Sequence, residues 1–201
     1  MPRVTALRAR DRDRVAVELD GHPWRVLPAD AVVRTGLVEG LELERTRLRL
    51  LRRELRRSEA LATAGRTLQR RDVSTHELDA RLARAGVPSA ARSDALTLLQ
   101  TAGVVDDERF ADATADALAR RSWGDAAIRF RLARLGIEPE LARRVCERQD
   151  DERVRAGRAV AARGRSLRTA GFLARRGFSE DAIEAAMGSF LADSDGEGYD
   201  V

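Results

Sequence analysis

The stretch LARAGV at residues 82–87 recurs as LARLGI at 132–137 and as LARRGF at 173–178. A glycine in the left-handed conformation just past a helix end forms a Schellman cap, in which the next residue contacts the residue five positions before it. Both positions are apolar in all three copies, and an arginine lies in the last turn, where a cation favours the helix dipole. The pattern therefore predicts helix ends at Gly86, Gly136 and Gly177.

Residues that favour a helix start follow each of these ends, at Pro88-Ser89, Glu138-Pro139 and Ser179-Glu180. Upstream, Ser74 lies three residues before Glu77, which is the spacing of a capping box. The serine hydroxyl then accepts a hydrogen bond from the backbone N–H of Glu77. A looser copy of the repeated stretch, LQTAGV at 99–104, predicts a further helix end at Gly103.

These starts and ends predict a mainly α-helical chain of nine helices in three tandem three-helix modules. Leu48, Leu51 and Leu55 have helical spacing and predict a long first helix, which Gly65 bends or interrupts. Modules of this size stack because none can bury its apolar face alone. We expect a linking helix and first module over 44–104, a second module over 105–150, a third over 151–191 and a disordered acidic tail over 192–201.

The first 43 residues have a different pattern. Val15, Val17 and Leu19 alternate with polar or small residues, as in a half-buried strand, and Asp20-Gly21 is a strong hairpin signal. We predict a small β-containing N-terminal extension over 1–43, in which a three-stranded β-meander is followed by a short helix from about Pro28 to Gly36. A meander of this size needs the following helix to pack against it.

The chain has 201 residues and a net charge of +4, but its charges are distributed in blocks. All 37 basic residues are arginine, as a GC-rich genome would encode, so the positions of the arginines are more informative than their identity. Residues 45–71 and 153–176 each carry a net charge of +8, whereas 177–201 contain seven acids and no base. Such blocks suit a polyanion or an acidic protein surface, although solvated helix faces explain them equally well. With no apolar run of membrane-spanning length, we expect a cytoplasmic protein without a membrane partner.

Candidate catalytic groups are few. Asp106 and Asp107 could hold a divalent metal, but a helix N-cap followed by an acidic first turn explains them better. Cys146 has helical spacing from Leu141 and Val145, which favours a small buried side chain over a nucleophile. Because no nucleotide-binding, metal-ligand or catalytic-triad pattern is present, we predict no cofactor, no metal and no enzymatic activity.

Arginine clusters favour nucleic-acid or protein binding instead, through salt-sensitive, sequence-tolerant phosphate contacts. One cluster surrounds Trp123 and the other lies in the acid-free stretch 153–176. The candidate binding residues are Arg120, Arg121, Arg129, Arg131, Arg165, Arg168, Arg175 and Arg176.

Four stretches, in order, resemble the RecX family of RecA regulators: VSTHELDARLARAGV, LLQTAGVVDDERFADA, RFRLARLGIEPELA and FLARRGFSEDAIEAAM. The resemblance extends from about Gly65 to Met187, and GVVDDERFA and ARRGFSEDAI are its most specific parts. The N-terminal meander is similar to a β-containing extension that some members carry.

The resemblance implies an elongated, curved, monomeric protein that lies in the groove of the RecA filament on DNA. It implies inhibition of the RecA ATPase and strand exchange, and thereby regulation of recombinational repair and the SOS response, with DNA phosphates as a secondary contact. Two other hypotheses stay open: a stand-alone basic DNA-binding regulator, and a metal-dependent hydrolase that uses Asp106 and Asp107.

Overall fold

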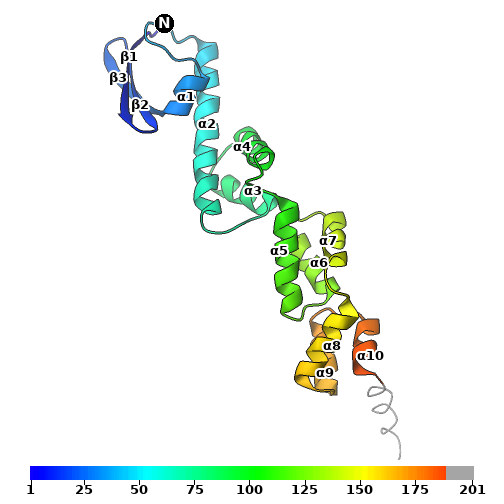
Figure 1. Cartoon of the computed structure of the whole chain (residues 1–201). Coiled ribbons are helices and arrows are strands. Elements are labelled where there is room, and N and C mark those ends of the chain that lie inside the picture. The colour runs from blue at the N-terminus through cyan, green and yellow to red at the C-terminus, as the bar shows by residue number, and fades with distance from the viewer. Residues whose placement is uncertain (189–201) are drawn as a thin grey trace, which may run out of the picture. The chain divides into compact units, whose positions relative to one another are not determined.

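The computed structural model describes residues 1–188, which form a small N-terminal sheet followed by helices (Figure 1). The predicted fold class is confirmed. The strands are β1 (Val4–Asp11), β2 (Arg14–Leu19) and β3 (His22–Pro28). The helices are α1 (Ala29–Arg34), α2 (Arg45–Leu68), α3 (Thr75–Arg84), α4 (Ser89–Thr101), α5 (Asp107–Arg120), α6 (Asp125–Arg134), α7 (Pro139–Glu147), α8 (Glu152–Arg163), α9 (Leu167–Arg175) and α10 (Glu180–Met187). The predicted acidic tail, 192–201, and residues 189–191 lie outside the described residues.

The sheet is an antiparallel meander in the order β1-β2-β3. Its second hairpin turns at Asp20 and Gly21, which have φ angles of 50° and 80°, as a two-residue type I′ turn requires. Val17 and Leu27 on one face are buried together with Leu51 of α2. The meander is therefore stabilised by α1 and α2, which complete its core.

The chain divides into two compact units. The first comprises Met1–Asp72 and Leu78–Val105, and the second comprises Val73–Glu77 and the residues from Asp106 onward. In the first unit, α2 runs without interruption through Gly65. The prediction that Gly65 interrupts the helix is therefore wrong. Ala60 and Ala64 of the same helix are fully buried, and their packing outweighs the helix-propensity penalty of glycine, which is about 1 kcal/mol relative to alanine.

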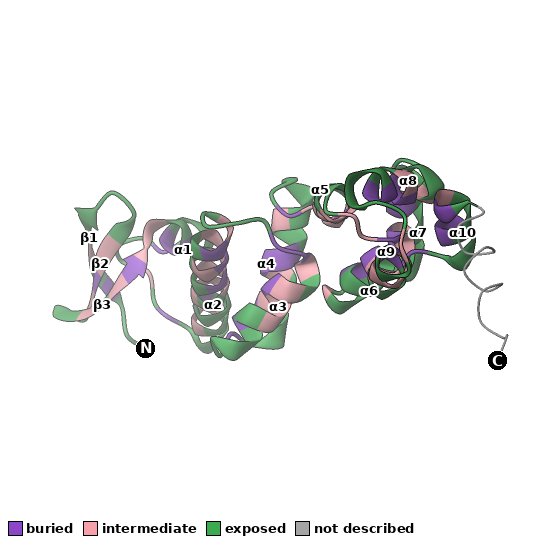
Figure 2. Ribbon diagram, turned by 90° about the horizontal axis from the view of Figure 1, so that it is seen from below, coloured by how far each residue is buried: buried purple, intermediate pink, exposed green. Residues whose placement is uncertain are grey.

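The second unit contains α5–α7 and α8–α10, and in each group the first helix packs against the third. Figure 2 shows buried positions, in purple, on α8, α9 and α10. Ala111, Ile128, Leu132 and Val145 lie in the core of the first group. The core of the second group includes Ala156, Leu173, Phe178, Ile183 and Met187.

Each glycine turn has the hydrogen bonds of a Schellman cap. The Ile137 N–H donates to the Leu132 carbonyl at 3.1 Å, and the Gly136 N–H donates to the Ala133 carbonyl at 2.9 Å. The turns at Gly86, Gly103 and Gly177 have the same two bonds, with positive φ angles between 65° and 79°. Val104, the last residue of the looser copy, is 46% exposed, whereas the last residue of each of the three repeated stretches is buried.

Two of these turns pack onto the start of another helix within the second unit. Ser74, the residue before α3, accepts from the Glu77 N–H at 3.1 Å and donates to the Leu135 carbonyl at 2.5 Å. At the second contact, the Gly124 N–H before α6 donates to the Arg176 carbonyl at 2.9 Å.

Acidic side chains complete both contacts in the same way. Asp107 accepts from the Thr75 N–H at 2.7 Å, and Glu152 accepts from the Asp125 N–H at 2.7 Å. In each case the first residue of one helix accepts from the first residue of another. The repeat therefore includes these contacts between helix starts as well as the helix ends.

Candidate functional site

Aromatic rings and guanidinium groups alternate in the second unit, in a row that we term the arginine–aromatic ladder. It consists of Trp123 before α6, Arg176 after α9, Phe172 within α9 and Arg163 at the end of α8. The Arg176 Cζ lies 5.0 Å from the centroid of the Trp123 ring and 5.2 Å from that of Phe172. The Arg163 Cζ lies 3.8 Å from the Phe172 centroid. These distances are in the range of cation–π interactions.

A hollow of about 670 Å³ adjoins the ladder at α9, and we term it the α9 hollow. It is lined by Arg163, Ser166, Arg168, Thr169, Phe172 and Arg175. No carboxylate is among these residues. Arg168 and Arg175 are exposed, and neither forms an ion pair within residues 1–188. The α9 hollow therefore has a strongly positive lining.

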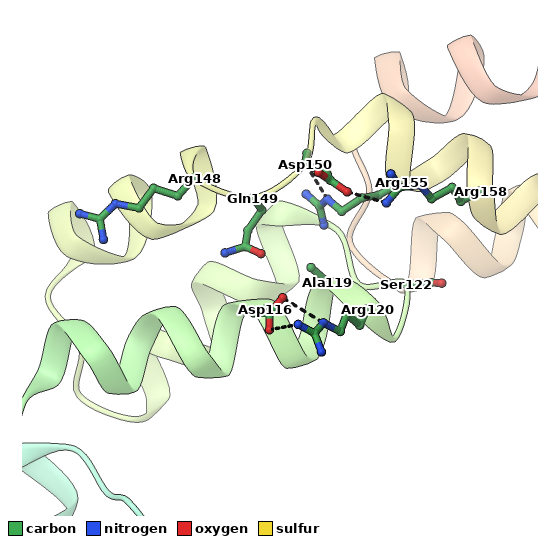
Figure 3. Close-up of a pocket in the computed structure, with 9 residues that line it drawn as sticks. All are labelled: Asp116, Ala119, Arg120, Ser122, Arg148, Gln149, Asp150, Arg155 and Arg158. Carbon is green, nitrogen blue, oxygen red and sulfur yellow. Dashed lines mark hydrogen bonds and ion pairs between the residues drawn. The ribbon is translucent and has the colours of Figure 1, made fainter.

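A second cavity, of about 420 Å³, contains more arginines, but these are already paired (Figure 3). Arg120 contacts Asp116 at 2.8 Å, and Arg158 contacts Asp150. Arg148 contacts Asp112 at 2.8 Å and also pairs with Glu108. Because their N–H donors are engaged with carboxylates, these arginines contribute less positive potential than their number suggests.

The predicted binding residues fall into separate places. Arg168, Arg175 and Arg176 belong to the α9 hollow or the ladder, and the carbonyl of Arg121 accepts from Arg176 at 3.5 Å. Arg165 lines a different cavity, between α8 and α10. Two further residues, Arg129 and Arg131 on α6, are exposed on either side of Phe130, which is itself 66% exposed. Arg120 pairs with Asp116, as described above.

Arg155 is an arginine whose role sequence reasoning missed. It is 5% exposed and pairs with Asp125, while it donates to the carbonyls of Trp123 at 2.6 Å and Asp150 at 2.9 Å. It therefore fastens α8 to the α5–α6 connection. The available signal was its helical spacing with Ala156, Ala159 and Val160, which places it on the buried face of α8.

The candidate catalytic groups have structural roles. The Asp106 side chain accepts from the Arg109 N–H at 3.0 Å, as an N-cap does, and Asp107 accepts from Thr75. Within residues 1–188, no three His, Cys, Asp or Glu side chains are grouped closely enough to hold a metal ion. Cys146 lies in the core of α5–α7, and burial raises the pKa of its thiol to about 11.

The first unit has a basic groove of its own, between α2 and the start of α4. It is lined by Arg49, Arg52, Arg53 and Arg56, together with Pro88, Ala90 and Ala91. Arg53 is engaged with Asp94 at 2.9 Å. The groove accounts for part of the positive block that the sequence shows over 45–71.

Comparison with known proteins gives the family. Residues 106–145 match the family model described as RecX, second three-helix domain. A protein of Acidithiobacillus ferrooxidans named Regulatory protein RecX is 35% identical over 143 residues, which are 66% of this chain and 91% of that protein. The chain belongs to the RecX family. A Halorhodospira halophila protein with the same name is 32% identical over 151 residues, which are 70% of this chain and 92% of the relative.

Solved structures show that the fold is shared as well. A crystal structure of regulatory protein RecX aligns with a TM-score of 0.80 over 92% of this chain and 98% of that one, at 16% identity. RecX from Lactobacillus salivarius aligns with a TM-score of 0.58 over 68% of this chain and 97% of that one, at 17% identity. The RecX relatives are named as regulatory proteins. Within residues 1–188, no helix is long and apolar enough to cross a membrane.

Proposed function

We propose that this RecX-family chain binds the RecA recombinase filament and inhibits its ATPase and strand-exchange activities. The observation that supports this most is the extent of the match to proteins named Regulatory protein RecX, which covers 91% or more of those relatives. The proposal describes a monomeric, cytoplasmic regulator of recombinational repair and the SOS response.

The proposed regulator acts by binding and carries out no reaction of its own. In support, Asp106 and Asp107 are occupied in capping and helix contacts, and the Cys146 thiol is buried and protonated at neutral pH. Exposed arginines supply the proposed contacts with acidic protein surface and with DNA phosphates. Of the predicted set, Arg121, Arg129, Arg131, Arg165, Arg168 and Arg175 have exposed side chains and no ion pair within residues 1–188.

The test adds the purified protein to RecA on single-stranded DNA with ATP and measures ATP hydrolysis and filament length. We expect both to fall at one regulator per several RecA protomers. Inhibition that is complete at far lower ratios would indicate capping of filament ends, whereas inhibition that rises with occupancy would indicate binding along the groove. No change in hydrolysis or length at these ratios would refute the proposal.

A second candidate, a stand-alone DNA-binding regulator, is favoured by the positive lining of the α9 hollow. It requires tight duplex binding without RecA, with a clear preference for a particular sequence. A weak affinity that decreases steeply with salt and shows no sequence preference would exclude it and would agree with DNA as a secondary contact.

A further inference from the structure

The ladder holds Arg163 through an aromatic contact, and within residues 1–188 the hydrogen-bond donors of this arginine are not engaged. A carboxylate that pairs with an arginine accepts from its N–H groups, as Asp116 does from Arg120 at 3.1 Å. An aromatic ring instead contacts the flat face of the guanidinium, so the in-plane N–H groups stay available. Arg163 is held in this second way by Phe172. Arg176 lies over Trp123 and Phe172 and also donates one guanidinium N–H to the Arg121 carbonyl at 3.5 Å, so only part of its donors stay available.

The surroundings of Phe172 add positive charge on the same side. Arg163, Arg168 and Arg175 line the α9 hollow, and none of them forms an ion pair within the described part of the chain. Ser166, the N-cap of α9, also lines the hollow, so the positive end of that helix dipole lies there. The hollow combines oriented donors, a positive potential and no competing carboxylate.

We propose that the α9 hollow and the ladder bind the phosphodiester backbone of nucleic acid without reading its sequence. Guanidinium groups with free in-plane donors match phosphate oxygens in charge and geometry. Base stacking is not part of the site, because two guanidinium groups already lie over the ring of Phe172. This inference rests on the proposed function, since it specifies where the secondary DNA contact of the RecA regulator is made.

The experiment measures binding of the full chain to fluorescently labelled oligothymidylate by anisotropy, without RecA, over a series of salt concentrations. The test variant is Arg168→Ala with Arg175→Ala. The matched control is Arg134→Ala with Arg144→Ala, which removes the same charge from exposed positions in the same unit that also form no ion pair within residues 1–188. We expect the test variant to lose about tenfold in affinity, and its salt slope to decrease by about 1.4, which is roughly 0.7 for each lost phosphate contact.

A second variant, Phe172→Leu, tests the ladder itself at constant charge. Leucine keeps an apolar side chain against the core of α8–α10 but presents no ring to Arg163 or Arg176. We expect this variant to bind the oligonucleotide about threefold more weakly because the guanidinium groups lose their fixed orientation. Circular dichroism melting shows whether Phe172→Leu is still folded. If it is not, the variant with Arg168→Ala and Arg175→Ala still tests the site, because those two side chains are exposed.

The outcomes separate this inference from the proposed function. Equal losses for the test and control variants would show a diffuse charge effect and would overturn the phosphate site. If the test variant keeps its DNA affinity but no longer inhibits the RecA ATPase, the hollow contacts the protein partner and the inference is wrong. If the wild type fails to inhibit RecA while the test variant alone loses DNA binding, the site stands and the proposed function fails.

Discussion

Gly124 and Gly177 contact each other through their backbones. A β-carbon added to Gly124 would overlap the carbonyl oxygen of Gly177, and the Gly124 N–H donates to the adjacent Arg176 carbonyl at 2.9 Å. The cap that ends α9 therefore rests directly on the start of α6. This close contact is what sets one three-helix group against the next in the second unit.

Gly124→Ala is expected to destabilise the second unit by about 1 to 3 kcal/mol, because the new methyl group forces two backbone segments apart. The matched control is Gly157→Ala in α8, where an added β-carbon meets nothing within 4 Å. That change is expected to stabilise by about 0.5 to 1 kcal/mol, since alanine favours the helix. Urea unfolding followed by Trp123 fluorescence, in a Trp24→Phe background, reports the second unit alone.

Urea unfolding also distinguishes two reasons why a repeated glycine resists substitution: the strain of a positive φ angle, and the overlap of an added β-carbon with a neighbouring residue. Gly86 and Gly136 have φ angles of 79° and 77°, so alanine costs about 1 to 2 kcal/mol at either position. An added β-carbon at Gly136 would also overlap the His76 β-carbon, whereas at Gly86 it meets nothing within 4 Å. We expect Gly136→Ala to lower the free energy of unfolding more than Gly86→Ala does. Unfolding of the Gly86→Ala variant is followed by the fluorescence of Trp24, because both residues lie in the first unit. Equal losses would refute the contact with His76.

The helix ends could be predicted because a Schellman cap depends on residues only five positions apart. Leu132, Gly136 and Ile137 contain the whole signal, and the same holds for the hairpin at Asp20-Gly21. Where the signal weakened, in the looser copy that ends at Val104, the cap formed but Val104 stayed exposed. Local chemistry therefore predicted the helix boundaries well.

The contacts between distant segments could not be predicted in this way. The partner of Gly136 is His76, sixty residues earlier, and nothing local to either residue indicates the other. In the ladder, Phe172 and Arg176 are four positions apart and could have been paired from helical spacing, but Trp123 could not. The charge of the positive block 153–176 likewise gave no indication that one of its arginines, Arg155, is buried.

Arg155→Met is expected to destabilise the second unit by about 2 to 3 kcal/mol. It leaves the Asp125 carboxylate and the Trp123 carbonyl without their donor. A buried polar group left without a partner lowers the free energy of unfolding by more than the intact hydrogen bond contributed to it. Asp125→Asn combined with Arg155→Met should be less costly than the sum of the two single changes, because the pair is then removed together. Strict additivity in a double-mutant cycle, measured by urea unfolding, would contradict the coupling.

Cys146 provides a probe of opening in the second unit. Its thiol is 4% exposed, and burial raises its pKa to about 11, so we expect almost no reaction with a disulfide reagent at pH 8 in the folded protein. Reaction should become rapid in urea, with the same midpoint as the Trp123 fluorescence. Fast labelling of the native protein at pH 8 would show that the α5–α7 core opens readily.

The same thiol makes stability depend on alkaline pH with a definite sign. In the unfolded chain the thiol ionises near its ordinary pKa of about 8.5, whereas in the folded chain it keeps its proton until about pH 11. Between these values the folded state binds more protons than the unfolded state, so the free energy of unfolding decreases as pH rises. Cys146→Ala should flatten that part of the pH profile, although the smaller side chain lowers stability throughout. If wild type and variant lose stability in parallel from pH 8.5 to 11, the thiol does not cause the decline.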